Sequence, residues 1–568
     1  MLFAVRSAAA LHRLLDLLPV FEGDDRIRCR FTLVPGSDFA ADALAAVDAA
    51  GARCVPWAEA LADRHDLILT ASPKGALGGL RGRQVLLPHG AGFNKALPRE
   101  GSPELPSGLD PTFLLSDGRP TAALHALAHP DQIERLAARL PGARRHAIVA
   151  GDPTLDRILE SLDRREAVRA ALGTGGRRLV VLSSTWGPQS LLSRRPDLPA
   201  GLAARLPYDG YQLALVVHPN EYSRTGTFDL SRRLRPALDA GLLLAAPYEE
   251  WAALLVAADV LVTDHGSVAL YAAALDLPVV AACDGGDELV PGSPMAHLLA
   301  AAPRLDHLDR SDRSAPDVPV LPEGPGGTRR FAERAFALAG QCLETLRPEL
   351  YGLLGLVPPP HPVRPRPLPV PERAPQAPDA FAVRASVEPA EAAEAAEAAE
   401  MAETVRGELI TVERLPPWTE LPFHHLAAEY GRAGTRRLQS AALLYRRADA
   451  PAARAGWHQE YRTAADWTAS VFAEYPNCRT AAVVLSPTAC LLRRDGGDPV
   501  TVHIAPDRSG GRIRRTDPAA ALSAAHVWLA AHPDGLGALP VGLTVRIGAT
   551  THRVRLERAT EGEREQPV

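Results

Sequence analysis

The sequence lacks most of the features that assign a protein class at once. Its six cysteines include no C-x-x-C pair, which argues against a disulfide framework or a zinc ribbon and suits a reducing compartment. No uncharged apolar run reaches the ~20 residues of a membrane span. Arg6, His12 and Arg13 interrupt the N-terminal apolar stretch, so it has no signal-peptide core. We therefore expect a cytoplasmic protein, at most peripheral at the inner face of a membrane.

The chain also lacks a basic excess. Its net charge of −5 and isoelectric point near 6.4 argue against nucleic-acid binding, which needs clustered positive charge. Hydrophobic residues make up 46% and charged residues 23%, as in ordinary globular proteins. At roughly 100–200 residues per domain, the chain is expected to form about three to five domains.

Two successive parts of the chain alternate apolar runs with amphipathic stretches. In residues 1–155, helices are predicted at 8–18 and 38–50, and strands at 2–5, 27–34, 66–70, 84–87 and 146–149. In residues 156–350, helices are predicted at 248–257 and 267–275, and strands at 178–183, 212–217, 242–245, 259–263 and 278–282. Strands without polar alternation, separated by helices, indicate parallel sheets covered on both faces. The predicted fold class is α/β, with two doubly wound Rossmann-type domains facing a cleft.

The rest of the sequence changes character twice. Residues 351–405 are predicted to be a linker: residues 357–378 are rich in proline and suit a polyproline II spacer, and residues 391–403 carry glutamate at every third position without basic partners. Residues 406–568 are predicted to be an α+β accessory domain. Its predicted helices are 423–431, 436–447 and 463–475, and its predicted strands are 481–485, 489–493, 500–504 and 542–547.

Two histidines follow apolar runs at the positions where doubly wound folds bind ligands. His89 comes soon after the run at 84–87 and is followed by Gly90 and Lys95, while His218 directly follows the run at 212–217. Alone, each is explained equally well as a turn histidine. If they face each other across a cleft, one can remove a proton from a hydroxyl while the other stabilises charge on a phosphoryl group.

Two further turns follow predicted strands. Between the strand at 259–263 and the next helix, Gly266 allows close approach of a phosphate, and Ser267 either binds that phosphate or caps the helix. Asp264 is suited to orient an imidazole or a ribose hydroxyl. The Gly151–Asp152–Pro153 turn is better explained as a structural connection between the two parts.

Together these segments resemble the CDP-glycerol glycerophosphotransferases of teichoic-acid synthesis, over about residues 85–290. The matching segments are His89-Gly90 with Lys95, Gly151-Asp152-Pro153 with Asp156, Ser183-Ser184-Thr185-Trp186, His218-Pro219 and Thr263-Asp264-His265-Gly266-Ser267. The order and spacing of the segments carry the resemblance more than any one of them.

The resemblance implies a GT-B fold and the transfer of a glycerol-phosphate-like group from a CDP-linked donor to a hydroxyl of a polyol or polymer acceptor. CMP would be released, in the synthesis of a cell-wall or surface polymer. It assigns His89 as general base and His218 as a phosphate-stabilising histidine. It assigns the donor phosphates to Asp264, Gly266, Ser267, Ser184, Thr185 and Lys95. Neither a cofactor nor a metal site is predicted.

Two other interpretations stay open. A nucleotide-sugar glycosyltransferase or a UDP-sugar 2-epimerase-like enzyme would use the same fold and a different leaving nucleotide. The other interpretation is a non-catalytic scaffold that presents residues 406–568 to a protein partner. It stays open because Thr154 and Gly187 stand where the family has arginines, so two charged phosphate contacts are missing. Within the accessory domain, the arginine-rich residues 507–515 are either an anion-binding loop or, as we favour, a solvated hairpin connection.

Overall fold

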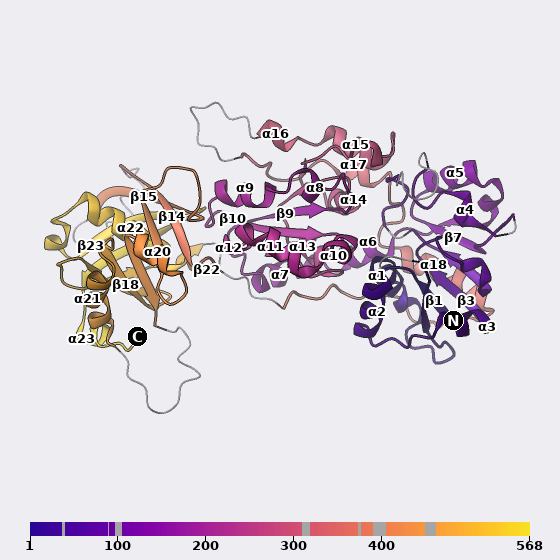
Figure 1. Ribbon diagram of the computed structural model, residues 1–568, viewed down its shortest axis with the longest axis horizontal. Helices are drawn as coiled ribbons and strands as arrows, with labels where there is room; N and C mark the ends of the chain where they lie inside the picture. Colours follow the sequence, from indigo (N-terminus) through magenta and orange to yellow (C-terminus); the bar gives the residue numbers. More distant parts are fainter. Residues whose placement is uncertain are drawn as a thin grey trace.

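The computed structural model describes residues 1–36, 40–88, 90–96, 105–116, 118–308, 319–372, 377–389, 405–448, 462–509 and 511–568. They form three bodies in a row, with the first α/β domain at one end, a second α/β domain in the middle and a β-barrel at the other end (Figure 1). None of the described helices is long and apolar enough to cross a membrane.

The first domain contains a parallel sheet in the order β2-β1-β3-β4-β7-β8. Its strands are β1 (Leu2–Val5), β2 (Arg30–Leu33), β3 (Arg64–Thr70), β4 (Arg81–Leu86), β7 (Leu124–Leu127) and β8 (Ala147–Val149). Its helices are α1 (Ala8–Leu15), α2 (Ala40–Ala49), α3 (Trp57–Ala62), α4 (Pro111–Leu114) and α5 (Pro130–Arg139), and a small hairpin is formed by β5 (Leu115–Ser116) and β6 (Arg119–Pro120). The predicted apolar runs form strands because they are buried between helices on both faces. The sequence analysis missed β7, a short run interrupted by His125.

The second domain repeats the pattern with the strand order β11-β10-β9-β12-β13, again parallel. Its strands are β9 (Arg178–Ser184), β10 (Tyr211–Val217), β11 (Leu243–Leu244), β12 (Val260–Thr263) and β13 (Val279–Ala281). Its helices are α6 (Pro153–Glu160), α7 (Arg165–Ala171), α8 (Leu191–Arg194), α9 (Leu198–Arg205), α10 (Pro219–Thr225), α11 (Thr227–Arg233), α12 (Arg235–Asp239), α13 (Glu250–Ala257), α14 (Val268–Ala274), α15 (Pro294–Ala301), α16 (Leu305–Leu308) and α17 (Arg329–Ala332). The two parallel sheets confirm the predicted fold class, a GT-B-like pair of doubly wound domains.

The helix that ends the second part of the chain packs on the first domain. This helix is α18 (Cys342–Leu354), and its residues Leu343, Leu346 and Leu350 belong to the core of the first domain. The Asp156 carboxylate accepts the backbone N–H groups of Gly340 and Cys342 at 2.8 and 2.7 Å, next to the start of the helix. The predicted domain boundary at residue 350 therefore cuts through a helix that the first domain buries.

The Pro-rich segment forms neither helix nor strand over residues 356–372. It is not an open spacer, because it lies against the α/β domains. Leu368 is buried and donates its N–H to the Ser161 hydroxyl at 2.9 Å, and the Arg366 carbonyl accepts a hydrogen bond from Arg157 at 3.0 Å. We call residues 356–372 the strap. The glutamate-rich residues 391–403 lie outside the described residues.

The accessory domain is a closed mixed barrel in the order β14-β15-β23-β24-β20-β19-β18-β17-β16. Its strands are β14 (Ala380–Pro389), β15 (Val405–Leu415), β16 (His425–Glu429), β17 (Leu443–Arg447), β18 (Thr480–Ser486), β19 (Ala489–Arg494), β20 (Val500–Ile504), β23 (Val541–Ile547) and β24 (Thr550–Arg558). Its helices are α20 (Thr435–Ser440), α21 (Ala464–Glu474), α22 (Pro518–Ala531) and α23 (Glu561–Arg564). The alanine-rich α22 is buried along most of its length inside the barrel, where small side chains let the strands approach it closely.

Two of the predicted helices of this domain were wrong in whole or part. Residues 423–431 contain the strand β16, and residues 436–447 divide into the short α20 and the strand β17. Alanine and leucine give these segments helical propensity, but pairing with β14 and β18 buries them as strands instead. The predicted helix at 463–475 is present as α21.

A buried arginine joins the barrel to the second domain. The Arg414 guanidinium, on β15, binds Asp209 of the second domain through two hydrogen bonds of 3.0 and 2.7 Å. It also donates to Asp517 of the barrel at 2.7 Å and lies over the Phe381 ring, 4.4 Å from the centroid. Arg414 has no exposed surface, and Asp209 depends on it for charge compensation, whereas Asp517 is also bonded to Arg447 at 2.9 Å.

We expect Arg414→Met to lower the free energy of unfolding by about 3–5 kcal/mol, because Asp209 loses its buried cation and Asp517 loses one of its two arginine partners. Urea unfolding measures the change. Arg384→Met is the matched control, since Arg384 pairs with Glu413 at 3.5 Å on the surface and its loss should cost at most about 1 kcal/mol. Equal losses in the two variants would contradict the buried role of Arg414.

The barrel should lose stability in mild acid because it buries two neutral histidines. Burial lowers the pKa of His526 to about 4, and burial beside His526 lowers the pKa of His425 further. Below pH 6.5 these two histidines bind protons in the unfolded chain but stay neutral in the folded barrel. The free energy of unfolding therefore falls as the pH drops from about 6.5 to 4. For His526 alone the loss is about 3 kcal/mol. Hydrogen exchange of the α22 amides, corrected for intrinsic rates, should show this loss of stability. In His526→Gln the loss should be smaller. A pH dependence that is the same in the variant and the parent chain would refute the role of His526.

Candidate functional site

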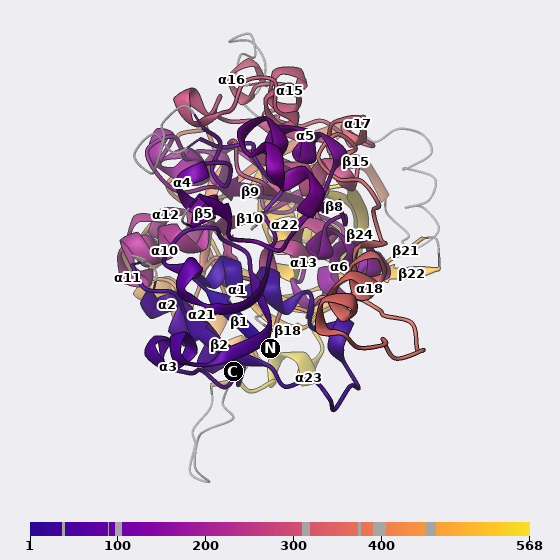
Figure 2. The same ribbon diagram turned by 90° about the vertical axis from the view of Figure 1, so that its right-hand side faces the viewer.

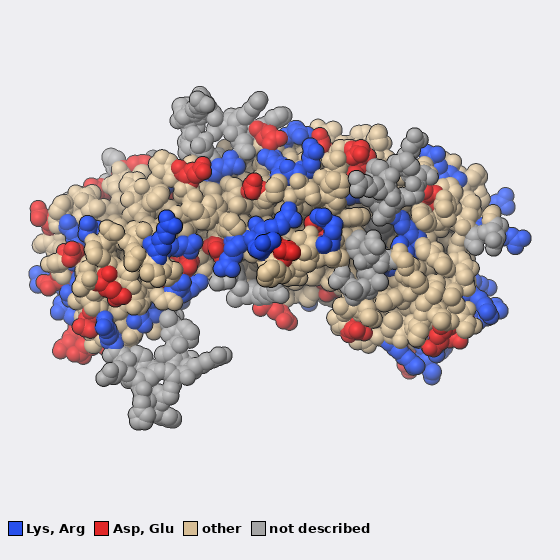
Figure 3. Space-filling model, in the orientation of Figure 1, with Lys and Arg blue, Asp and Glu red and all other residues tan. Residues whose placement is uncertain are grey.

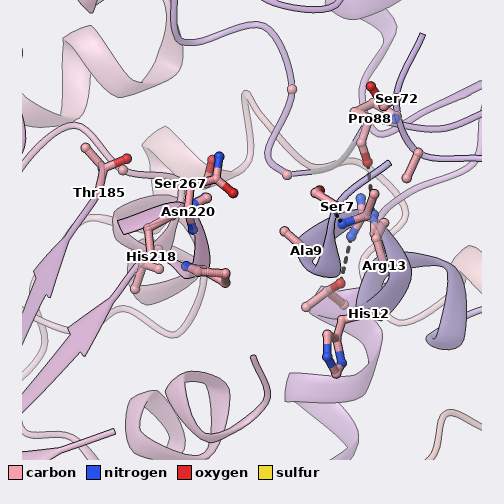
Figure 4. Close-up of a pocket in the computed structure, with 18 of the residues that line it drawn as sticks. Ser7, Ala9, His12, Arg13, Ser72, Pro88, Thr185, His218, Asn220 and Ser267 are labelled. Carbon is pink, nitrogen blue, oxygen red and sulfur yellow. Dashed lines mark hydrogen bonds between the residues drawn. The ribbon is translucent and has the colours of Figure 1, made fainter. Parts of the chain in front are cut away.

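A cleft of about 350 Å³ lies between the two α/β domains. The carboxyl ends of strands from both sheets line it, including the ends of β1 and β3 in the first domain and of β9 and β12 in the second. These are the two places where the strand order reverses, which is where doubly wound sheets bind ligands. Figure 4 shows the two walls, with Thr185, His218 and Ser267 on one side and Ser7 and Ser72 on the other.

His218 lies on the wall that the second domain contributes. It follows β10 directly and caps α10, and its Nδ1 accepts the Asn220 N–H at 3.1 Å. In the neutral ring this bond leaves the proton on Nε2, so the imidazole is a hydrogen-bond donor through that nitrogen. The Trp186 ring, whose centroid is 6.4 Å from that of His218, lines the same wall.

His89 lies outside the described residues, but the residue before it is firmly held. The Pro88 carbonyl accepts a hydrogen bond from Arg13 Nε at 3.1 Å, and Arg13 forms a buried bidentate ion pair with Asp152 at 2.7 and 2.5 Å. Asp152 also accepts the Leu155 N–H at the start of α6 and the Tyr271 hydroxyl from the second domain. The turn at residues 151–153 is therefore structural, as the sequence analysis favoured.

Gly90 and Ser267 bring two predicted segments together across the cleft. A Cβ atom added to Gly90 would lie 3.0 Å from the Ser267 hydroxyl, so the first-domain loop passes directly over Ser267. The helix after Ser267 is α14, and Ser267 forms no side-chain capping bond to it. The residues Ser184, Thr185 and Gly266 line the same wall.

Asp264 supports this wall from behind and does not line the cleft. Its buried carboxylate accepts the backbone N–H groups of Thr185, Leu191 and Gly266 at 2.8, 2.7 and 2.9 Å. Burial raises the pKa of this carboxyl, against the opposing effects of His265 and the N–H donors. Asp264 thus ties the loop after β9 to the turn after β12, which makes it a positioning residue. A Cβ atom at Gly266 would lie 3.2 Å from the Asp264 carboxylate, so a larger residue would press on this contact.

Lys95 lines the cleft but is already paired. Its Nζ lies 2.7 Å from Glu288 and 3.2 Å from the Trp186 carbonyl, so this first-domain lysine reaches into the second domain. Glu288 is 3.0 Å from His265 Nε2 as well. Burial would raise the Glu288 pKa, but the hydrogen bonds from His265 and Lys95 outweigh it and lower that pKa. The ammonium group therefore joins the two domains, and Glu288 balances its charge.

The sequence analysis missed a polar cluster on the cleft lining. Arg157 bridges Asp16 at 3.0 Å and Glu249 at 2.8 Å, and His12 stacks on Tyr248 with ring centroids 4.8 Å apart. Burial lowers the pKa of His12 to about 4, so this imidazole is neutral at pH 7. Nothing in the sequence marks these residues, because they come from α1, α6 and the loop after β11.

No three His, Cys, Asp or Glu side chains of the described residues come together as metal ligands.

Comparison with known proteins gives distant structural similarity only. No protein-family model matches the chain, and no curated protein matches its sequence. The solved structures similar to it include the wall teichoic acid polymerase TagF, at 13% identity and a TM-score of 0.36, covering 62% of this chain and 84% of that one. They also include the UDP-GlcNAc 2-epimerase of Methanocaldococcus jannaschii in complex with UDP-GlcNAc and UDP, at 12% identity and a TM-score of 0.40, covering 62% and 99%. The UDP-GlcNAc 2-epimerase of Neisseria meningitidis bound to UDP-GlcNAc matches at 11% identity and a TM-score of 0.37, covering 62% and 98%. These values assign no activity.

We expect Asp264→Asn to lower the free energy of unfolding by about 2–3 kcal/mol. The amide keeps one oxygen acceptor and turns an NH₂ group toward a backbone N–H, so a charge-assisted bond is lost and a buried donor loses its partner. Urea unfolding measures this loss. The control is Asp287→Asn, because Asp287 accepts one bond from Gln189 at the surface; an equal effect there would contradict the assigned role.

Proposed function

We propose that this chain is a transferase whose cleft binds a nucleotide-diphosphate-linked donor. It moves a glycerol-phosphate-like group from a CDP-linked donor to an acceptor hydroxyl and releases CMP, in the synthesis of a cell-wall or surface polymer. The proposal rests on the residues of the cleft, and the family resemblance of the segments His89-Gly90, His218-Pro219 and 263–267 supplies the identity of the transferred group.

One observation carries the proposal: the placement of His218 on the cleft wall with its Nδ1 engaged. Because Nδ1 accepts the Asn220 N–H, the neutral ring carries its proton on Nε2, and donation from Nε2 to an anionic oxygen is the role we propose. Ser267 and Thr185 add hydroxyl groups to the same wall. This donor set favours an oxygen that gains negative charge during reaction, as a phosphoryl oxygen does.

The reaction forms one bond and breaks one. The acceptor oxygen attacks the β-phosphorus of the donor in line, and the bond from that phosphorus to the bridging oxygen breaks, so CMP leaves with the electron pair. His89 accepts the proton of the acceptor hydroxyl as general base. His218 Nε2–H and the Ser267 hydroxyl donate to the non-bridging oxygens as their charge grows.

The first domain contributes the other wall and so positions the acceptor. Arg13 fixes the Pro88 carbonyl one residue before His89 in the sequence, and Gly90 lies over Ser267. The two described residues that flank the proposed base in the sequence are thus each held in place, Pro88 by Arg13 and Gly90 against Ser267. Orientation of this kind supplies much of the rate enhancement of two-substrate reactions.

We expect His218→Ala to slow the release of CMP from CDP-glycerol by about 10²–10³-fold, because one hydrogen-bond donor to the developing charge is lost. The measurement is CMP formed per enzyme at saturating donor. His503→Ala, which alters a histidine on the barrel paired with Glu557, is the control and should leave the rate unchanged.

The nucleotide-linked donor that the chain binds distinguishes the proposed transferase from a nucleotide-sugar enzyme and from a scaffold. CDP-glycerol at about a hundred times its Kd should stabilise the folded chain by about 2.7 kcal/mol in thermal unfolding, whereas UDP- and GDP-linked donors should not. Stabilisation by a UDP-sugar, with release of UDP, would replace the proposal by a nucleotide-sugar enzyme. A chain that binds none of these donors would be a scaffold.

A further inference from the structure

A small basic hairpin stands apart from the barrel wall. It consists of β21 (Asp507–Ser509) and β22 (Arg512–Arg514), which pair only with each other. Figure 2 shows the two strands projecting from the body of the molecule. The sequence analysis favoured a solvated connection here, and the structure places the segment as a protrusion.

The hairpin presents an apolar side chain among arginines. Ile513 is 58% exposed, and Arg508, Arg514 and Arg515 are exposed as well. Arg508 is directly opposite Ile513 in the register of the two strands. Arg514 and Arg515 directly follow Ile513 in the sequence, and both are exposed. The hairpin and the residue after it therefore combine one large apolar group with three positive charges.

These arginines are not neutralised by the protein around them. Arg508, Arg514 and Arg515 form no ion pair with any residue that the structure describes. The basic side chains over α11 and α12, visible in Figure 3, are different: Arg232 pairs with Asp229 at 3.0 Å and Arg235 with Asp239 at 2.7 Å.

The barrel wall beside the hairpin carries further charge of the same sign. Arg553 and Arg555 point outward from β24, which lies next to the hairpin. The acidic residues nearby are Asp507 in the hairpin and Glu557 on β24, and Glu557 is shared between His503 at 2.6 Å and Arg555 at 3.3 Å. Positive charge is thus concentrated around this hairpin, in a chain whose net charge is −5.

We propose that this hairpin docks the chain on an anionic lipid surface. Arg508, Arg514 and Arg515 pair with lipid phosphates, and Ile513 enters the boundary between headgroups and acyl chains. Ile513 selects the lipid surface over a soluble polyanion, because phosphates along a polymer would engage the arginines and leave the isoleucine in water. The inference is independent of the proposed transferase activity.

The test is co-sedimentation of the full-length chain with vesicles of phosphatidylcholine alone or mixed with phosphatidylglycerol. Binding should require phosphatidylglycerol and weaken as salt is added. Removing two positive charges with Arg508→Ser and Arg515→Ser should weaken binding by about 25-fold, at about fivefold for each arginine. Ile513→Ser should weaken binding while leaving its salt dependence unchanged.

The matched control is Arg232→Ser with Arg235→Ser, which removes the same charge from α11 and α12, on the side of the molecule opposite the hairpin in Figure 2. Vesicle binding by this variant should equal that of the parent chain. The proposal is overturned if the parent chain does not bind anionic vesicles, or if both double variants lose vesicle binding equally. It is also overturned if Ile513→Ser does not change vesicle binding. In the last case the hairpin binds polyanions in general. Thermal unfolding of each variant checks that the barrel stays folded.

Discussion

The buried ion pair between Arg13 and Asp152 is the contact on which the geometry of the cleft depends. Arg13 comes from the first helix of the chain, and Asp152 begins the helix that enters the second domain. Through its Nε, Arg13 also holds the Pro88 carbonyl, and through Tyr271 the same carboxylate reaches α14. One charge pair therefore fixes the loop of one wall, the junction of the domains and a helix of the other wall. A buried pair is costly to form and more costly to break by removing one partner, so it specifies this arrangement strongly.

A second set of contacts between the two walls centres on the Glu288 carboxylate, which binds a lysine from across the domain boundary. Lys95 and His265 both approach Glu288, and the backbone of Lys95 pairs with that of Leu289. Such contacts align the domains without large apolar surfaces between them. The cleft thus carries polar groups from both domains within a lining that is mostly apolar.

Much of the fold and part of the site were predictable from the sequence, for physical reasons. Parallel strands buried on both faces must be apolar throughout, so β9 and β10 are plain in the sequence, and residues at their ends, such as His218 and Thr185, could be placed at the cleft. In the barrel, β24 alternates arginine with apolar residues and was not recognised, because half of its side chains face outward.

The rest of the site depends on contacts that no local pattern carries. Asp264 was predicted to touch the donor, yet three backbone N–H groups from two loops turn it inward. Lys95 was predicted to bind phosphate, and its pairing with Glu288 depends on a loop far along the chain that only the folded structure brings near. The local sequence thus locates the ends of the strands, but it does not identify the groups with which the side chains there form hydrogen bonds and ion pairs.

The strap limits how the cleft can open. Arg366 forms an ion pair with Glu22 in the first domain, while two residues later Leu368 is bonded to Ser161 just after α6. Two residues of extended backbone span only about 7 Å, so there is little slack between these anchors. Widening the cleft by a rotation of one α/β domain against the other would have to break the Arg366–Glu22 ion pair or the Leu368–Ser161 hydrogen bond. The width of the cleft is thereby coupled to the seating of the strap on both domains.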